Sequence, residues 1–200
     1  MTGLYIAARY TYRVCVLYDY REKNSHIEQE LEVRKQEEQE LFLRASCDVL
    51  TGFYNRSYAE ETMAAMQREN TGFILCFIDL DGLKYVNDHF GHEEGDRYLR
   101  MVAEQIRRGC RSGRDFLCRY GGDEFLVLFT ETDVDVARER VRLVNDRLHA
   151  LKKDSSFPYA LSFSYGIVQS REFNDWRAMI RSADEQMYEQ KLNKKTVRGD

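Results

Sequence analysis

The feature that most constrains the fold is an unbroken apolar run at residues 73–79, Phe-Ile-Leu-Cys-Phe-Ile-Asp, which ends in a carboxylate. A strand with one face in water alternates apolar and polar side chains, whereas a strand covered on both faces stays apolar throughout. We therefore predict a central strand here, covered on both of its faces. Because this buried strand ends in an acidic residue, we expect chemistry at that end.

Beyond Asp48, turn signals separate strongly periodic segments, as is typical of domains that combine helices with a sheet. We expect helices at about 55–69, 95–109, 134–151 and 175–192, and further strands at 116–120, 124–130 and 159–169. The first helix should be amphipathic, with one side formed by Tyr58, Thr62, Ala65 and Met66. This order predicts an α+β fold with a mostly antiparallel central sheet surrounded by helices.

The first 46 residues have a different composition. Residues 10–20 are rich in β-branched and aromatic types, which indicates a strand. Residues 22–46 are dominated by Glu, Gln, Lys, Arg and Leu, which predicts a helix. Several apolar residues of this helix fit a heptad seam, namely Ile27, Leu31, Leu41 and Ala45. A solvated connector and a dimerising coiled-coil stalk fit this pattern equally well.

Composition excludes several classes of protein. The formal net charge of −4 argues against a protein that grips DNA or RNA, because that requires a clear excess of Lys and Arg. The five cysteines are scattered and lack metal-ligand spacing, so neither a disulfide framework nor a zinc site is expected. No run approaches the roughly 18 apolar residues that a membrane span needs, so we expect no membrane contact by this fragment.

Two apolar strands end in acidic groups next to glycines, at residues 77–82, Phe-Ile-Asp-Leu-Asp-Gly, and 120–125, Tyr-Gly-Gly-Asp-Glu-Phe. The paired glycines predict a tight hairpin, because glycine supplies the positive φ values of such turns. Either acidic segment alone could be a solvated turn. If the strands are neighbours, the carboxylates converge and repel one another. A hard divalent cation such as Mg²⁺ is the usual relief, and it also binds substrate phosphates.

Four motifs in order make the chain similar to the GGDEF domain of diguanylate cyclases. They lie at 48–56, Asp-Val-Leu-Thr-Gly-Phe-Tyr-Asn-Arg; at 79–96, beginning Asp-Leu-Asp-Gly; at 119–125, Arg-Tyr-Gly-Gly-Asp-Glu-Phe; and at 183–191, beginning Ala-Asp-Glu-Gln. Separated motifs in the right order are far more specific than any one of them. The resemblance spans roughly residues 47–198. It implies a catalytic domain at 47–200 with a nucleotidyl-cyclase palm-like fold.

The resemblance also implies roles for single residues. Asp79, the carbonyl of Leu80, and Asp123 match the family's ligands for Mg²⁺ or Mn²⁺. Asp123 would also help deprotonate the attacking 3′-hydroxyl, and Glu124 and Lys84 complete the candidate catalytic set. An amide and a carboxylate can satisfy the donor and acceptor edges of guanine, and Asn87 and Asp96 match that pair.

The triphosphate would be neutralised by the cations that match the family's, namely Lys84, Lys191 and Lys195. Backbone amides around Gly82, Leu83 and Lys84 can cradle phosphate oxygens. Each assignment has a simpler alternative: Lys191 and Lys195 could be ordinary cations at a helix C-terminus, and Asn87 could merely cap a turn.

The resemblance implies a reaction in which two GTP molecules become cyclic di-GMP with release of two pyrophosphates. Each domain would hold one GTP, so a homodimer is needed. A cytoplasmic bacterial location is expected. The chain would be part of a larger protein, and whether that protein is anchored to a membrane is left open. Residues 16–23 are similar to the exit of PAS sensor domains, so we interpret 1–21 as the remnant of an upstream sensor. The alternatives are a catalytically silent GGDEF module that binds GTP or cyclic di-GMP, and a relative using another nucleotide, which Asn87 and Asp96 disfavour.

One motif departs from the family pattern. Many cyclases carry Arg-x-x-Asp upstream of the signature, where product binds and inhibits. Here Asp115 matches the aspartate of this motif, but Ser112 occupies the position of its arginine. Arg111 and Arg114 lie near that position and not on it. We therefore expect this inhibitory site to be degenerate and product inhibition to be weak or absent.

Overall fold

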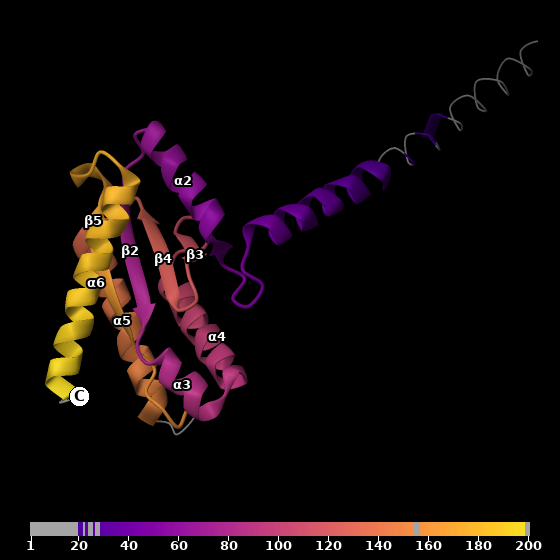
Figure 1. Ribbon diagram of the computed structural model, residues 1–200. Coiled ribbons are helices and arrows are strands. Elements are labelled where there is room, and N and C mark those ends of the chain that lie inside the picture. Colours follow the sequence, from indigo (N-terminus) through magenta and orange to yellow (C-terminus); the bar gives the residue numbers. More distant parts are fainter. Residues whose placement is uncertain (1–19, 22, 24–25, 27–28, 154–156, 199–200) are drawn as a thin grey trace, which may run out of the picture. The chain divides into compact units, whose positions relative to one another are not determined.

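The computed structural model describes residues 20, 21, 23, 26, 29–153 and 157–198 (Figure 1). The chain divides into two units, residues 1–45 and 46–200. In the first unit residues 29–45 are helical, and the side chains of 29–44 are exposed, including Leu31 and Leu41 of the expected heptad seam. The strand expected at 10–20 lies outside the described residues apart from Tyr20, which is helical. The choice between stalk and connector stays a prediction.

The second unit is built on a five-stranded sheet in the order β1-β3-β4-β2-β5. β2 pairs antiparallel with both β4 and β5, β3 pairs antiparallel with β4, and β1 runs parallel to β3. The predicted, mostly antiparallel sheet is therefore confirmed. The strands are β1 (Tyr54–Asn55), β2 (Phe73–Leu80), β3 (Phe116–Arg119), β4 (Glu124–Thr130) and β5 (Phe163–Gln169).

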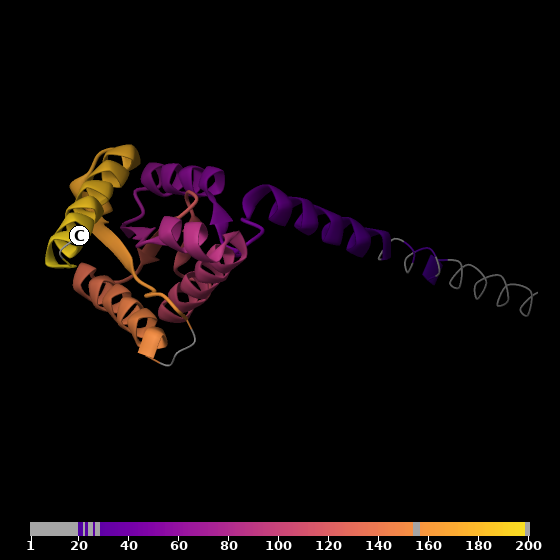
Figure 2. The same ribbon diagram turned by 60° about the horizontal axis from the view of Figure 1, so that its bottom comes forward.

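Helices cover both faces of this sheet (Figures 1 and 2). They are α2 (Arg56–Arg68), α3 (Leu83–Phe90), α4 (His92–Gly109), α5 (Val134–Lys153) and α6 (Trp176–Arg198), with a short 3₁₀ helix η1 (Ser170–Glu172). The α+β class predicted from the order of elements is confirmed. Within the described ranges, no helix is long and apolar enough to cross a bilayer.

Strand β2 explains why two helical layers are needed. Its side chains alternate between two buried clusters, as the period of two in a strand dictates. Phe73, Leu75 and Phe77 pack with residues of α2 and α6, whereas Ile74, Cys76 and Ile78 pack with residues of α4 and α5. The unbroken apolar run therefore has the cause inferred from the sequence, because both faces of the strand are covered.

The C-terminal helix α6 lies unusually close to β5. A Cβ atom added at Gly166 would lie 1.9 Å from the carbonyl oxygen of Ala183, so any side chain at this position would push the helix off the sheet. Gly166 thereby fixes the distance between α6 and the strand beneath it. The same helix passes the end of β2, where the acidic residues lie.

Two expectations about the helices need correction. The buried face of α2 is centred on Ala59 and Met63, while Tyr58 and Met66 are only partly buried. Helix α3 was not expected at all. It begins at Leu83 after Gly82, whose φ of 79° only glycine adopts readily, and Gly91 separates it from α4. Neither start carries a side-chain cap, so the usual signal for a helix N-terminus is missing.

Candidate functional site

The two acidic strand ends meet on one side of the sheet. Asp79 of β2 and Glu124 of β4 are direct partners in the antiparallel register. The backbone N–H of Leu80 donates to the carbonyl of Asp123 at 3.0 Å. Both Asp79 and Glu124 lie on the strand face that packs against α2 and α6, since they continue the alternation of Phe77 and Leu126. Neighbouring strands thus bring together acidic residues that lie more than forty positions apart in the sequence.

One lysine of α6 contacts this acidic group. The ammonium Nζ of Lys191 lies 2.5 Å from Oδ1 of Asp79. Burial acts to lower the pKa of Lys191, but the hydrogen bond and charge of Asp79 outweigh burial and raise it. Lys191 therefore remains a cation beside the strand ends, where the sequence predicted a phosphate-binding charge.

Burial, with a smaller contribution from neighbouring carboxylates, outweighs the effect of that single cation. Burial raises the pKa of Asp79, and the charges of Asp123 and Asp81 add to this, although Lys191 opposes them. Burial also raises the pKa of Glu124, together with the charges of Asp123, Asp79 and Asp184. The carboxylates are thus held close enough to disfavour one another's ionisation. A divalent cation bound among them would relieve this repulsion.

The donor set at the strand ends fits a magnesium-type ion. The oxygens of Asp79 and Asp123, with the backbone near Leu80, are hard ligands of the kind that Mg²⁺ prefers. No three His, Cys, Asp or Glu side chains in the described part of the chain form a complete ligand set. Mg²⁺ usually takes one or two carboxylates and fills its remaining positions with phosphates and water.

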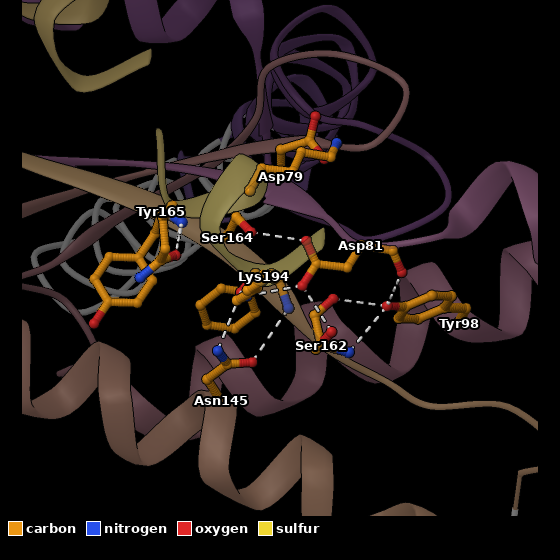
Figure 3. Close-up of polar contacts among 11 residues, drawn as sticks. Asp79, Asp81, Tyr98, Asn145, Ser162, Ser164, Tyr165 and Lys194 are labelled. Atoms are coloured by element: carbon orange, nitrogen blue, oxygen red, sulfur yellow. Dashed lines mark hydrogen bonds and ion pairs between the residues drawn. The ribbon is translucent and has the colours of Figure 1, made fainter. Parts of the chain in front are cut away.

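A second carboxylate, Asp81, has a different environment that the sequence did not reveal. It accepts hydrogen bonds from Ser162 Oγ at 2.7 Å, from Ser164 Oγ at 2.8 Å and from Lys194 Nζ at 2.8 Å (Figure 3). Burial opposes ionisation of Asp81, but Lys194 and the two hydroxyls outweigh it and lower the pKa of this carboxyl. The surroundings of Asp81 therefore favour its ionised form, whereas those of Asp79 disfavour it.

The signature turn is held by Arg119. Its guanidinium donates to the carbonyl of Gly122 at 2.7 Å and pairs with Asp48 at 3.1 Å. Asp48 also accepts from the backbone N–H of Thr51 at 2.9 Å, so the first motif and the signature motif form one structure. No role for Arg119 was predicted from the sequence. Its place beside the signature was the available signal.

The reason expected for the paired glycines is wrong. Neither Gly121 nor Gly122 is among the described glycines with positive φ. A Cβ at Gly121 would instead lie 2.3 Å from Oε2 of Glu124, whereas one at Gly122 would meet nothing within 4 Å. Gly121 therefore makes room for the Glu124 side chain, which folds back over the turn.

The expected phosphate-binding turn is the first turn of α3. Gly82 is the N-cap, Leu83 is buried, and Lys84 is exposed. The first N–H groups of a helix have no intrahelical acceptor, so they can bind an anion. This turn directly follows Asp79 and Asp81 in the chain, so the N-terminus of α3 lies at the end of β2 that carries these carboxylates.

The two residues expected to read guanine are close to each other. Asn87 lies on α3, and its side chain packs over Gly95 of α4, where a Cβ would lie 1.9 Å from Asn87 Oδ1. Asp96 follows Gly95, is about half exposed, and lies 3.7 Å from Arg100. The Gly91 break between α3 and α4 thus brings an amide and a carboxylate to the same junction.

Two further predicted residues have different outcomes. The side chain of Lys195 lies outside the described part of the structure. The neighbouring Lys194, which was not predicted, contacts Asp81 instead.

The side chain of Asp115 is fully buried and pairs with Arg111 at 2.8 Å and with Arg140 of α5 at 3.5 Å. The sequence indicated Arg111 as a neighbour but gave no sign of Arg140.

Comparison with known proteins agrees with this geometry. A family model described as diguanylate cyclase, GGDEF domain, matches residues 45–196. The probable diguanylate cyclase DgcJ of Escherichia coli K12 is 28% identical over 151 residues, which cover 74% of this chain and 29% of DgcJ. The diguanylate cyclase DosC of the same strain is 33% identical over 147 residues, which cover 70% of this chain and 32% of DosC. The chain thus spans about a third of these relatives.

A solved structure shows the same fold. The coiled coil and GGDEF domain of DgcB from Caulobacter crescentus, crystallised with c-di-GMP, aligns with a TM-score of 0.72 at 24% identity and covers 86% of this chain and 94% of that one. The family model covers most of the sequence, and the signature acids lie together at one end of the sheet. The chain belongs to the family of GGDEF domains and is homologous to diguanylate cyclases.

Proposed function

We propose that this domain is an active diguanylate cyclase, which condenses two GTP molecules into cyclic di-GMP and releases two pyrophosphates. The observation that carries the proposal is the register that pairs Asp79 with Glu124 and bonds Leu80 to Asp123, beside the cation Lys191. Each acidic residue of the signature is present and lies near the others. This favours an enzyme over a silent module, which usually lacks one of these acids.

In the proposed mechanism each domain binds one GTP. Asn87 and Asp96 hydrogen-bond to the edge of guanine, which leaves no buried polar group of the base unpaired. The first turn of α3 and the ammonium groups of Lys84 and Lys191 hold the triphosphate, and Lys195 is proposed to assist them. These contacts fix the nucleotide so that its α-phosphorus faces the second domain.

Asp79, the Leu80 carbonyl and Asp123 are proposed to hold Mg²⁺ or Mn²⁺. Such a cation neutralises phosphate charge and makes a bound hydroxyl more acidic. Asp123 accepts the proton of the 3′-hydroxyl, and Glu124 supports the charge arrangement beside it. The 3′-oxygen of one GTP then bonds to the α-phosphorus of the other as the bond to pyrophosphate breaks. Positioning and charge neutralisation supply most of the rate.

Ring closure needs two such domains facing each other, so we propose a homodimer. The helix at residues 29–45 would set the separation of the two domains, and an upstream sensor would control it. The second candidate is a silent module that binds GTP or cyclic di-GMP. The buried carboxylate of Asp115, already paired with two arginines, weighs against product binding at that position.

The test is incubation of the protein with GTP and Mg²⁺, followed by chromatography for cyclic di-GMP. The proposal predicts cyclic di-GMP and pyrophosphate in a ratio of one to two. Binding of GTP without product would favour the silent module, and turnover of another nucleotide in preference to GTP would refute the guanine assignment.

A further inference from the structure

Two lysines of α6 reach two carboxylates that are two residues apart. Lys191 contacts Asp79 at 2.5 Å, and Lys194 contacts Asp81 at 2.8 Å. Residues three apart lie on the same face of a helix, so one face of α6 carries both cations across the end of β2. The two ion pairs are of similar length, but the hydrogen-bond partners around them differ.

Among the described hydrogen bonds, Asp81 has three donors and Asp79 has one. The Asp81 carboxylate accepts from two serine hydroxyls as well as from Lys194. For Asp79, Lys191 is the one donor to the carboxylate among the described hydrogen bonds. Lys194 also donates to the backbone carbonyl of Phe163 at 2.6 Å. Lys194 is thus held at two points, while in the described part of the chain Lys191 has a single acceptor, to which the proposed cation would also bind.

Several elements fix the surroundings of Lys194 (Figure 3). The amide of Asn145, from α5, donates to the Phe163 carbonyl at 3.1 Å and accepts from the Phe163 N–H at 3.2 Å. The hydroxyl of Tyr98, from α4, donates to the Ser162 carbonyl at 2.7 Å, with the Asp81 carbonyl at 3.0 Å. Lys194 therefore binds a rigid acceptor site built by the sheet and the helices on its far face.

A buried ion pair is a poor device for stability alone, since a well-packed apolar pair of similar volume is often as stable. It is, however, directional, because the ammonium must meet defined acceptors. The side chains of Lys194 and Asp81 are only 26% and 11% exposed, and each has more than one hydrogen-bond partner. A contact of this kind fixes the rotation and the height of the helix that carries it.

We infer that Lys194 is a positioning residue for the proposed reaction. By binding Asp81 and the Phe163 carbonyl, it holds the end of α6 so that Lys191, one turn earlier, faces Asp79 and the phosphates of bound GTP. This inference rests on the proposed function. The two lysines then have different roles. Lys194 stays bound to Asp81 and holds the helix, whereas Lys191 leaves Asp79 and binds phosphate when nucleotide and metal bind.

The experiment introduces Lys194→Met, which keeps most of the length of the side chain and removes its charge, into the wild-type protein and into the variant Lys191→Met. Affinity for a non-hydrolysable GTP analogue with Mg²⁺ is measured by calorimetry. We expect Kd to rise about tenfold in the wild-type background, as for loss of a well-placed charged contact. In the Lys191→Met background the same change should alter Kd less than about twofold, because Lys194 acts through Lys191. Lys194→Arg should retain most of the affinity.

The matched control is Arg181→Met, which removes an exposed cation from the same helix and should leave Kd unchanged. Additive effects of Lys191→Met and Lys194→Met on Kd would overturn the inference, since they would mean that Lys194 acts independently. A fall in the melting temperature with unchanged Kd would also overturn it, because the residue would then be merely structural.

Hydrogen exchange tests the anchor without nucleotide. In Lys194→Met, the amides of residues 190–194 should exchange at least about tenfold faster than in the wild type, while those of residues 179–183 should not change. Unchanged exchange at 190–194 would refute the anchoring contact. If the wild-type protein binds no GTP analogue at all, the proposed function fails, and the exchange rates still decide whether Lys194 holds the helix.

Discussion

Replacement of Gly95 by alanine should separate nucleotide recognition from stability. Inside a helix alanine is ordinarily about 1 kcal/mol more favourable than glycine. In this protein the new Cβ would lie 1.9 Å from Oδ1 and 2.9 Å from Cγ of Asn87, whereas ordinary contact begins at 3.4 Å. The Asn87 amide must therefore move by about 1.5 Å, the difference between 3.4 and 1.9 Å.

The expected size of the effect follows from that displacement. A hydrogen bond between Asn87 and guanine near 2.9 Å would be lost, because contacts stretched well beyond about 3.5 Å no longer count as hydrogen bonds. Loss of one such bond, with a polar edge of the base left unpaired, costs about 2 kcal/mol. This corresponds to about a 30-fold fall in kcat/KM for GTP. The gain in helix propensity should keep the free energy of unfolding within about 1 kcal/mol of wild type.

The assay is steady-state formation of cyclic di-GMP at varied GTP concentration, with chemical denaturation measured on the same samples. Asn87→Ala supplies the matched background, because it removes the oxygen that the new Cβ would meet. There, Gly95→Ala should leave kcat/KM unchanged and stabilise the protein by up to about 1 kcal/mol. Wild-type kcat/KM in the single variant Gly95→Ala would refute the placement of Asn87 as the guanine reader.

The remaining predictions concern three acidic residues. Asp123→Ala should abolish turnover while circular dichroism and the melting temperature stay close to wild type; retained activity would discredit the assigned metal site. Asp115→Ala should destabilise the protein by about 2 kcal/mol or more, because it leaves Arg111 and Arg140 without their buried partner. Calorimetry should detect no tight cyclic di-GMP binding that depends on Asp115. Since the pKa of Glu124 is raised in the folded state, its ionised form destabilises the protein above that pKa, and this penalty vanishes below the usual glutamate pKa. Glu124→Gln should therefore be more stable than wild type at pH 7, and denaturation curves should show the difference shrinking as the pH falls to about 4.5; a constant difference would contradict the stated cause.

The sequence predicted the parts of the fold that depend on strong local patterns. The apolar run of β2 predicted a central strand, and the two strands around Gly121-Gly122 predicted a hairpin; the sheet contains both, with β2 between β4 and β5 and with β3 antiparallel to β4. That β2 and β4 are neighbours was only a condition of the sequence argument. Helix α3 escaped prediction, since Gly82 and Gly91 replace the side-chain caps that normally mark a helix start. The buried face of α2 was displaced by one position, since tertiary packing decides which side of a weakly amphipathic helix faces the core.

Of the candidate site, only the residues that belong to the matched sequence motifs could be predicted. Asp79, Glu124 and Lys191 follow from matched motifs and prove to be close in space. The role of Lys194 depends on which face of α6 meets Asp81, and one residue along a helix turns that face by about 100°. The glycine at 121 was expected for its backbone freedom, but its function depends on the Glu124 side chain, a contact that no local pattern reveals.

The proposed metal site is tested most directly by a crystal structure of the protein with a non-hydrolysable GTP analogue and Mg²⁺. We predict a cation bound by the carboxylates of Asp79 and Asp123 at about 2.1 Å, with phosphate oxygens completing its shell and Lys191 turned from Asp79 to the phosphates. A nucleotide bound away from these two acids, or a Lys191 that still contacts Asp79 with no cation beside it, would refute the proposed metal site.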